Sequence, residues 1–176
     1  MSVHLEIERK FLVKFPNSWI QLSDLFDTLV DVKRISQSYL SPKPGEQAGR
    51  VRKTVSGLTG DTDTTYDYNR KAPKGTGVHK EIEHKINQSQ YEKFLQHTDP
   101  DKSVVDKTRF VFEYNDQTFE LDVFRGPLHG LAILEIELED KNDKVELPPF
   151  LRIYKEVTED KRYSNFSLAD KKYHKK

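Results

Sequence analysis

Charged and apolar residues alternate along much of this chain, and no other sequence feature constrains the fold as strongly. In FELDVF from Phe119, Glu120 and Asp122 alternate with apolar residues, and LEIEL from Leu134 repeats the arrangement. Successive side chains of a β-strand point to opposite faces, so a period of two predicts strands with one charged face and one apolar face. The chain is therefore expected to be mostly antiparallel sheet.

Eight segments carry this strand pattern, and clusters of turn residues separate them. The predicted strands are residues 3–14, 32–41, 49–56, 63–72, 77–86, 103–114, 117–125 and 130–140. Asn115 and Asp116 stand between two strongly alternating runs and predict a tight hairpin. The pattern thus predicts a mainly β fold, with eight strands in chain order.

Helix signals are fewer and lie between or after the strands. Asn87 or Ser89 would cap a helix over about 88–97, and a second helix would begin at Asn17 or Ser18. The stretch after the two prolines at 148–149 is expected to form loops and short helices, and about 171–176 a solvated basic tail. Because 176 residues is the length of one domain, we expect residues 1–176 to form a single domain.

Composition excludes several classes of protein. The chain has no cysteine, which excludes disulfides, thiolate catalysis and cysteine-bound zinc. It has 29 Lys plus Arg and 29 Asp plus Glu, and zero net charge argues against a general nucleic-acid binder. It lacks the run of roughly 18–20 apolar residues that a membrane helix needs, and its first residues lack the apolar stretch of a signal peptide. We expect a soluble, cytoplasmic protein that does not bind membranes.

The charged faces of the strands allow two interpretations. In an ordinary antiparallel sheet the charged face meets water and the apolar face is buried. Alternatively, the charged faces line the inside of a closed eight-stranded barrel, which has room for side chains or one small ligand. Two details favour the second interpretation: like charges recur at i and i+2, as in Arg50/Arg52 and Lys107/Arg109, and few Thr, Ser or Gln accompany them. The pattern alone leaves both interpretations open.

If the charges face inward, their chemistry specifies a ligand. Carboxylates from several strands repel one another unless a cation lies among them, and an all-oxygen set favours a hard ion such as Mg²⁺ or Mn²⁺. Clustered Arg and Lys require an anion of high charge, and guanidinium groups match phosphate oxygens. The two clusters together predict a site for a compact polyanion such as triphosphate.

The order of these motifs resembles a known family. EIERK from Glu6 resembles the ExExK signature of the CYTH superfamily, also called triphosphate tunnel metalloenzymes, and the chain most resembles its small stand-alone bacterial members. The resemblance continues in register through QSYL from Gln37, RVRKT from Arg50, Lys71 before a glycine-containing turn, KEIEHKI from Lys80, DKTRF from Asp106, FELDVF from Phe119, LEIELED from Leu134 and EVTEDKRYSN from Glu156.

This resemblance implies an eight-stranded antiparallel closed tunnel barrel, with a few flanking helices, that binds triphosphate and Mg²⁺ or Mn²⁺. The implied metal ligands are Glu6, Glu8, Glu135 and Glu137, supported by Glu83 and Asp122. The implied phosphate-binding residues are Lys10, Arg50, Arg52, Lys71, Lys107 and Arg109, with Lys161 and Arg162 near the tunnel mouth. Glu8, Glu137 and Lys107 are the implied catalytic residues, and Glu81 and Glu120 are further candidates without an assigned role.

The activity implied is hydrolysis of inorganic triphosphate, or of a nucleoside or thiamine triphosphate, by direct attack of water. Two alternatives remain. The superfamily also contains class IV adenylyl cyclases, which form cyclic AMP on the same frame, and a non-catalytic polyphosphate-binding module would carry the same charges. The expected partner is a small molecule that contains triphosphate, and the sequence leaves homodimer formation open.

Overall fold

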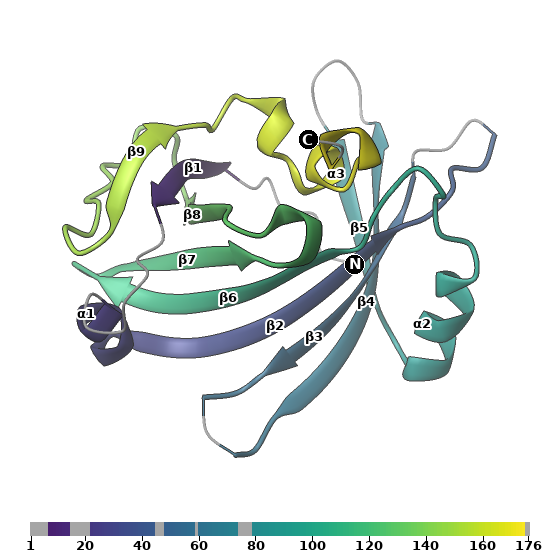
Figure 1. The fold of residues 1–176 in the computed structure, drawn as a ribbon, viewed down its shortest axis with the longest axis horizontal. Coiled ribbons are helices and arrows are strands. Elements are labelled where there is room, and N and C mark those ends of the chain that lie inside the picture. Colours follow the sequence, from purple (N-terminus) through teal and green to yellow (C-terminus); the bar gives the residue numbers. More distant parts are fainter. Residues whose placement is uncertain (1–6, 15–21, 45–47, 59, 74–78, 175–176) are drawn as a thin grey trace.

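The computed structural model describes residues 7–14, 22–44, 48–58, 60–73 and 79–174, with side chains except at 71–73, 79–81 and 173–174. They form one antiparallel nine-stranded sheet in the order β5-β4-β3-β2-β6-β7-β8-β1-β9 (Figure 1). The strands are β1 (Ile7–Lys14), β2 (Leu29–Tyr39), β3 (Arg50–Ser56), β4 (Asp63–Pro73), β5 (His79–Ile86), β6 (Val105–Tyr114), β7 (Gln117–Phe124), β8 (Ala132–Leu138) and β9 (Arg152–Glu156). All eight predicted strands are confirmed within the described residues, with shifts of one to three residues at several ends, whereas residues 3–6 and 77–78 of the predicted strands lie outside the described range.

The remaining elements are short helices. They are α1 (Ser23–Asp27), α2 (Gln88–Leu95), α3 (Asn165–Leu168) and the 3-10 turns η2 (Gly126–Leu128), η3 (Lys161–Tyr163) and η4 (Lys171–His174). The predicted helix at 88–97 is confirmed as α2, which Asn87 and Gln90 close with a reciprocal capping box. The helix expected to begin at Asn17 or Ser18 is seen from Ser23, because residues 15–21 lie outside the described range.

The β6–β7 hairpin turns as the sequence predicts. Tyr114 pairs with Gln117, which leaves a two-residue loop. Asn115 and Asp116 both have positive φ, 47° and 57°, the backbone of a type I′ turn. This tight turn keeps Lys107 and Arg109 of β6 in register with the acidic face of β7.

One strand was not expected. β9 pairs with the free edge of β1, with Phe11 opposite Glu156, and Arg9 donates from Nε and an Nη to the Glu156 carboxylate at 2.8 and 2.9 Å. Sequence reasoning missed β9 because it is short, follows two prolines and leaves most of its side chains exposed without alternation. This ion pair also explains why Arg9 stands on the otherwise apolar side of β1.

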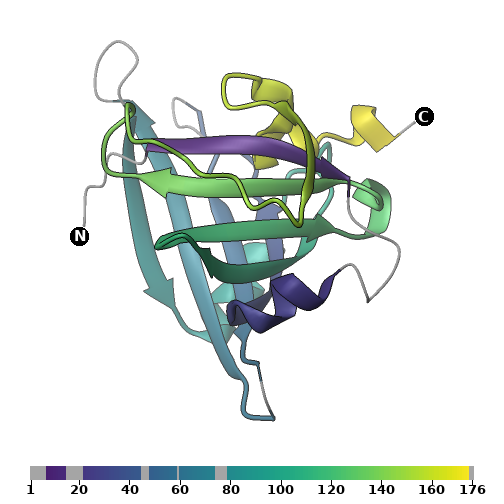
Figure 2. The ribbon, with the colours of Figure 1, turned by 90° about the vertical axis from the view of Figure 1, so that its left-hand side faces the viewer.

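The sheet curves strongly into a barrel (Figure 2), and within the described residues no ladder joins its two edge strands, β5 and β9. The antiparallel tunnel fold is thus confirmed, while the closure expected from eight strands is not seen in the described part. A physical reason is visible in the pairing: β9 occupies the edge of β1 that would otherwise face β5.

The apolar faces of the strands point outward and are covered by helices and loops. α1 inserts Leu25 into a cluster with Phe112, Phe119 and Leu134, all under 1 % exposed. α2 covers the other end of the sheet, where Tyr91 packs against Tyr66 and Val51. This arrangement decides between the two interpretations of the sequence: the charged faces lie on the concave side, and two of the three apolar clusters lie outside the sheet.

The carboxyl-terminal segment closes one end of the barrel. Val157, Leu168 and Ala169 are buried against Leu12 and Phe124, which lie on the concave side of their strands. η4 follows, and Lys171 Nζ donates to the Pro100 carbonyl at 2.6 Å. Among the described residues no helix is long and apolar enough to cross a membrane.

Candidate functional site

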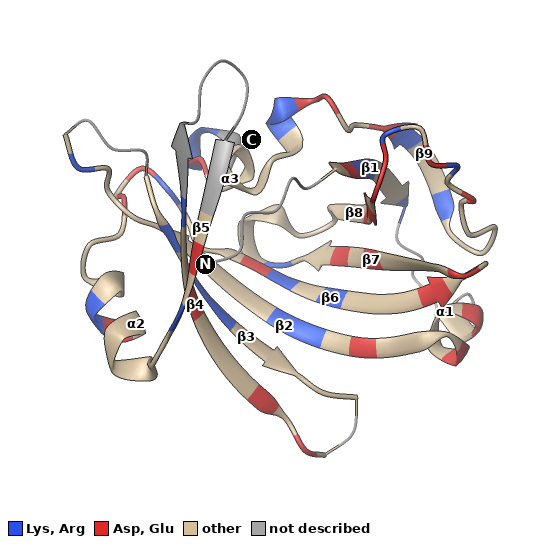
Figure 3. Cartoon of the chain, turned by 180° about the vertical axis from the view of Figure 1, so that it is seen from behind, with Lys and Arg blue, Asp and Glu red and all other residues tan. Residues whose placement is uncertain are grey.

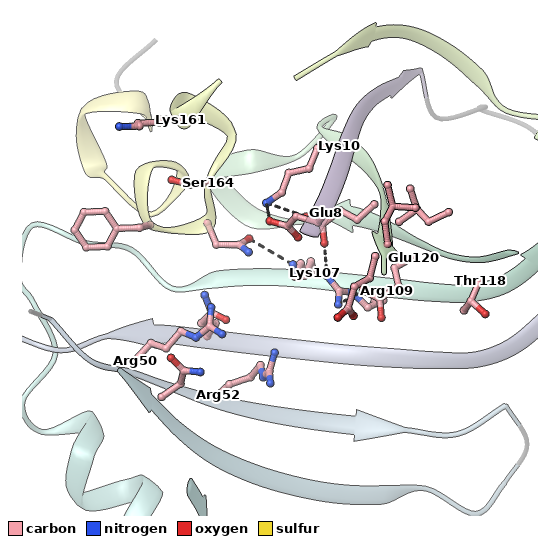
Figure 4. A pocket seen from close by; sticks show the side chains of 18 of the residues that line it. Glu8, Lys10, Arg50, Arg52, Lys107, Arg109, Thr118, Glu120, Lys161 and Ser164 are labelled. Atoms are coloured by element: carbon pink, nitrogen blue, oxygen red, sulfur yellow. Dashed lines mark hydrogen bonds and ion pairs between the residues drawn. The ribbon is translucent and has the colours of Figure 1, made fainter. Parts of the chain in front are cut away.

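The concave side of the sheet encloses a hollow of about 1270 Å³ lined by charged side chains. Side chains of β1, β2, β3, β4, β6, β7 and β8 line it, and residues 161–167 contribute at the closed end. In Figure 4, Arg50 and Arg52 lie on one side and Glu8, Lys10 and Glu120 on the other, with Lys107 and Arg109 between them. The period of two places them there, since every second residue of each strand faces the hollow.

An acidic wall forms where β1, β8 and β7 adjoin (Figure 3). Glu8 lies directly opposite Glu137, and Glu135 directly opposite Glu120, in register. Like charges directly opposite in an antiparallel pair are destabilising. A divalent cation would relieve this repulsion, and carboxylate oxygens are the ligands that hard cations prefer. The donor set therefore fits a hard divalent cation.

Basic side chains partly neutralise this wall. Lys10 Nζ lies 2.9 Å from Glu8 Oε1 and 3.4 Å from Glu135 Oε1. Burial lowers the pKa of the Lys10 ammonium, but the nearby Glu135 and Glu8 outweigh burial and the pKa is raised overall. Lys10 therefore stays charged at neutral pH and lies between two of the predicted metal ligands.

Arg109 binds three carboxylates in a buried network of ion pairs. Its Nε and Nη2 donate to the two oxygens of Asp122 at 2.6 and 2.8 Å, Nη2 also donates to Glu135 at 2.9 Å, and Nη1 pairs with Glu120. Lys107 Nζ lies 2.5 Å from the same Asp122. Burial alone would raise the pKa of Asp122, but Lys107 and Arg109 lower it to about 2.

The network has consequences for the roles that the sequence suggested. Asp122 is fully buried and does not line the hollow, so it contacts the site through Lys107 and Arg109. Burial lowers the pKa of the Lys107 ammonium, and the Asp122 carboxylate opposes that effect. Burial raises the pKa of Glu120, and Arg109 opposes that effect. Asp122 thus orients two cations of the site.

The basic wall consists of two arginines on β3, which pairs with β4. Arg50 and Arg52 line the hollow, and their partners across the β3–β4 ladder are Asn69 and Asp67. Arg52 Nε donates to Asp67 Oδ2 at 3.1 Å, and one Nη lies 3.5 Å from Glu83 Oε1. Two adjacent guanidinium groups on one face can bind phosphate oxygens bidentately.

The closed end of the hollow adds polar groups from the carboxyl-terminal segment. Ser164 caps α3 by accepting from the Ser167 amide at 3.2 Å. Asn165 Oδ1 accepts from Lys107 Nζ at 3.4 Å, and Lys161 also lines the hollow. The segment that plugs the barrel therefore also completes the surroundings of Lys107.

The structure brings most of the predicted site residues together. Those that line the hollow are Glu8, Lys10, Arg50, Arg52, Lys107, Arg109, Glu135, Glu137 and Lys161. Glu83 contacts the hollow through Arg52, and Arg162 donates instead to Asp160 at 2.9 and 2.6 Å with a side chain 66 % exposed. Glu6 lies outside the described residues, as do the side chains of Lys71 and Glu81.

Sequence reasoning did not assign several polar residues that the structure places at the site. Gln37, Tyr39, Asn69, Thr118 and Asn165 line the hollow, and Gln37 Nε2 donates to the Tyr39 hydroxyl at 2.8 Å. Strand parity was the available signal for the first three, because they share the inward face with Arg50 and Arg52. Asn165 had no such signal, since its position depends on how the carboxyl-terminal segment folds back.

No three His, Asp or Glu side chains are grouped as a ready metal site within the described residues, which do not include Glu6. Glu8, Glu135 and Glu137 still present oxygen donors from neighbouring strands to one hollow. A cation held in this hollow would draw its oxygen ligands from these side chains.

Comparison with known proteins agrees with this geometry. The chain is 34% identical over 168 residues to an inorganic triphosphatase of Nitrosomonas europaea. The aligned region covers 93% of this chain and 96% of that protein. It is 41% identical over 73 residues to an inorganic triphosphatase of Acetivibrio thermocellus, a match that spans 46% of that relative's length.

Solved structures show the same fold. A crystal structure of an inorganic triphosphatase superposes with a TM-score of 0.60 at 33% identity, covering 93% of this chain and 97% of that one. A putative adenylyl cyclase from Hippeastrum, described as having a dominant triphosphatase activity, shares the fold at 15% identity and a TM-score of 0.54, covering 77% and 80%. The CYTH domain model matches residues 4–173, and the chain belongs to the CYTH domain family.

Proposed function

We propose that this chain is a metal-dependent triphosphatase that hydrolyses inorganic triphosphate, or a triphosphate-bearing small molecule, inside the hollow. The observation that supports this most is the pair of opposed walls: carboxylates on β1, β7 and β8 face guanidinium groups on β3 across about 1270 Å³. A triphosphate chain needs both walls, because its oxygens bind the cations directly and the carboxylates through metal. The similar proteins of Nitrosomonas and Acetivibrio are named inorganic triphosphatases.

In the proposed mechanism, Arg50, Arg52 and Lys10 bind phosphate oxygens and fix the chain in line. Bound Mg²⁺ or Mn²⁺ would supply charge neutralisation at the phosphate oxygens. Glu8 and Glu137, opposite one another at the end of the acidic wall, orient the attacking water. Phosphoryl transfer depends mainly on positioning and electrostatics, which a buried charged hollow provides.

The remaining predicted residues have supporting roles in this proposal. Lys107 and Arg109 offset charge that develops on the phosphoryl group, and Asp122 and Glu83 hold cations in place. Lys71, Lys161 and Arg162 attract the anion toward the hollow, and Glu6 completes the metal ligands beside Glu8.

The experiment is phosphate release from tripolyphosphate, measured with Mg²⁺, with Mn²⁺ and with EDTA, beside an assay for cyclic AMP formed from ATP. We expect phosphate release that requires the metal. Cyclic AMP without phosphate release would favour the cyclase alternative, and tight tripolyphosphate binding without turnover at any metal concentration would favour a binding module.

Two variants test the walls separately. Glu8→Gln removes a charge from the acidic wall and Arg52→Ala a cation from the basic wall, and each should lower kcat/KM about a hundredfold or more. Their matched controls are Glu92→Gln, at an exposed position of α2, and Arg152→Ala, at an exposed position of β9. Both controls should keep full activity. Near-normal rates in both wall variants would contradict the proposal.

A further inference from the structure

One buried carboxylate of the barrel is not explained by the roles assigned so far. Asp67 of β4 is 1 % exposed, although Asp is rarely buried without a partner. It lies on the concave side of the sheet but is not among the residues that line the hollow, whereas Arg52 does line it. Any effect of its carboxylate on the hollow must therefore pass through a side chain that contacts both.

That side chain is Arg52. The two residues are directly opposite in the β3–β4 ladder, and Arg52 Nε donates to Asp67 Oδ2 at 3.1 Å. Asp67 Oδ1 has no hydrogen-bond partner among the described residues. A buried carboxylate with one described partner depends strongly on that partner, since the loss of either leaves an uncompensated charge.

The contact also determines which part of Arg52 is available to a ligand. A guanidinium has five donors in a rigid plane, and Asp67 binds it from the Nε edge. The described contact of its Nη atoms, with Glu83, is long at 3.5 Å, and the Glu83 side chain is 44% exposed. The terminal nitrogens therefore keep donors for an anion in the hollow.

We propose that Asp67 is a positioning residue that holds Arg52 by its Nε edge and aims the terminal guanidinium nitrogens at the phosphate oxygens of the substrate. This inference deepens the proposed function and rests on it, because it names the residue that preorganises one phosphate ligand. Arg50, the neighbouring arginine, has a neutral Asn69 in the equivalent ladder position. The two arginines of the basic wall thus have ladder partners that differ in charge.

The test is a double-mutant cycle. Asp67→Asn keeps the shape and removes the charge, and in the otherwise native protein it should raise KM for tripolyphosphate about tenfold, a typical cost of losing a residue behind a binding group. In the Arg52→Ala background the same substitution should have no further effect, because the residue that it positions is gone. Asp63→Asn, the same change at an exposed position of β4, is the matched control and should leave KM unchanged.

Folding is checked separately, because Asp67 is buried. Thermal unfolding accompanies each variant, and Asp67→Ala, which adds no atoms to the buried position, gives a second measurement if Asp67→Asn does not fold. Asp67→Ala should show the same rise in KM. An equal effect of either Asp67 substitution with and without Arg52, or no effect on KM, would overturn the proposal.

The same cycle is measured on tripolyphosphate affinity by calorimetry. If the native protein binds tripolyphosphate but does not hydrolyse it, the proposed function fails while the coupling between Asp67 and Arg52 is still tested by affinity. If hydrolysis is normal and the two substitutions act independently, the positioning role alone is refuted.

Discussion

At the scale of single residues, Arg109 is the side chain on which the acidic wall depends most. Its guanidinium binds Asp122, Glu135 and Glu120 together, and its side chain is only 15 % exposed. Three carboxylates gathered in a small volume repel one another, so this arginine stabilises the fold as well as the site.

We expect Arg109→Met to lower the free energy of unfolding by about 3–5 kcal/mol, the usual cost of removing one member of a buried ion network. Arg162→Met is the control, since the Arg162 side chain is 66 % exposed and pairs with Asp160 at the surface; this substitution should cost less than about 0.5 kcal/mol. Chemical denaturation of both variants measures the difference. Equal, small losses would show that the network contributes little.

At the scale of elements, β9 is held to β1 by the backbone pairing of the two strands and by an ion pair at the end of β9. The Arg9–Glu156 contact is bidentate, and Thr158 accepts from the Lys10 amide at 3.1 Å. These contacts bring the carboxyl-terminal segment back toward the barrel, where α3 then reaches the hollow. β9 therefore links an exposed edge to the closed end of the site.

The hydrogen bond from Arg9 lowers the pKa of Glu156 below its ordinary value of 4.5. A carboxyl whose folded pKa is depressed contributes stability above its unfolded pKa and loses it as the pH falls through the folded value. The protection factors of the β9 amides, which correct for the intrinsic pH dependence of exchange, should therefore fall below about pH 4.5, and Glu156→Gln should show lower protection factors at pH 7 and lose that pH dependence. The pair is exposed, so the effect on global stability should stay within about 1 kcal/mol.

The control for this exchange experiment is Lys155→Ala, which changes an exposed neighbour on the same strand. Its β9 amides should exchange as in the native protein, with the same dependence on pH. Native exchange rates in Glu156→Gln would show that the ladder alone holds β9.

At the scale of the whole molecule, the fold separates two kinds of contact. Apolar clusters lie outside the curved sheet and at its closed end, and the concave side is left for charges. At the closed end the carboxyl-terminal segment meets the strands, because Leu168 belongs to one buried cluster with residues of β1, β2, β6, β7 and β8. The carboxyl-terminal segment is thus part of the structure that shapes the hollow.

Leu168→Ala should destabilise the protein by about 2–4 kcal/mol, the cost of a cavity at a buried leucine. It should also raise KM for tripolyphosphate, because α3 carries Asn165 to Lys107. Lys172→Ala, at an exposed position just beyond α3, is the control and should change neither quantity. Native stability in Leu168→Ala would mean that the segment does not close the hollow.

The sequence by itself determined which residues share a face. Strand parity is a local property, so Glu8, Lys10, Arg50, Arg52 and the other alternating charges could be grouped without a structure. The hairpin at 115–116 and the helix at 88–95 were also predictable, because turn and capping chemistry act over a few residues.

Only the tertiary structure decided which way the charged faces point, since the same alternation suits an outward, solvated face. It also decided that Asp122 lies behind Lys107 and Arg109, that Asp67 holds Arg52 and that β9 covers the edge of β1. These facts depend on the curvature of the sheet and on the register between strands, which contacts distant in the sequence fix together.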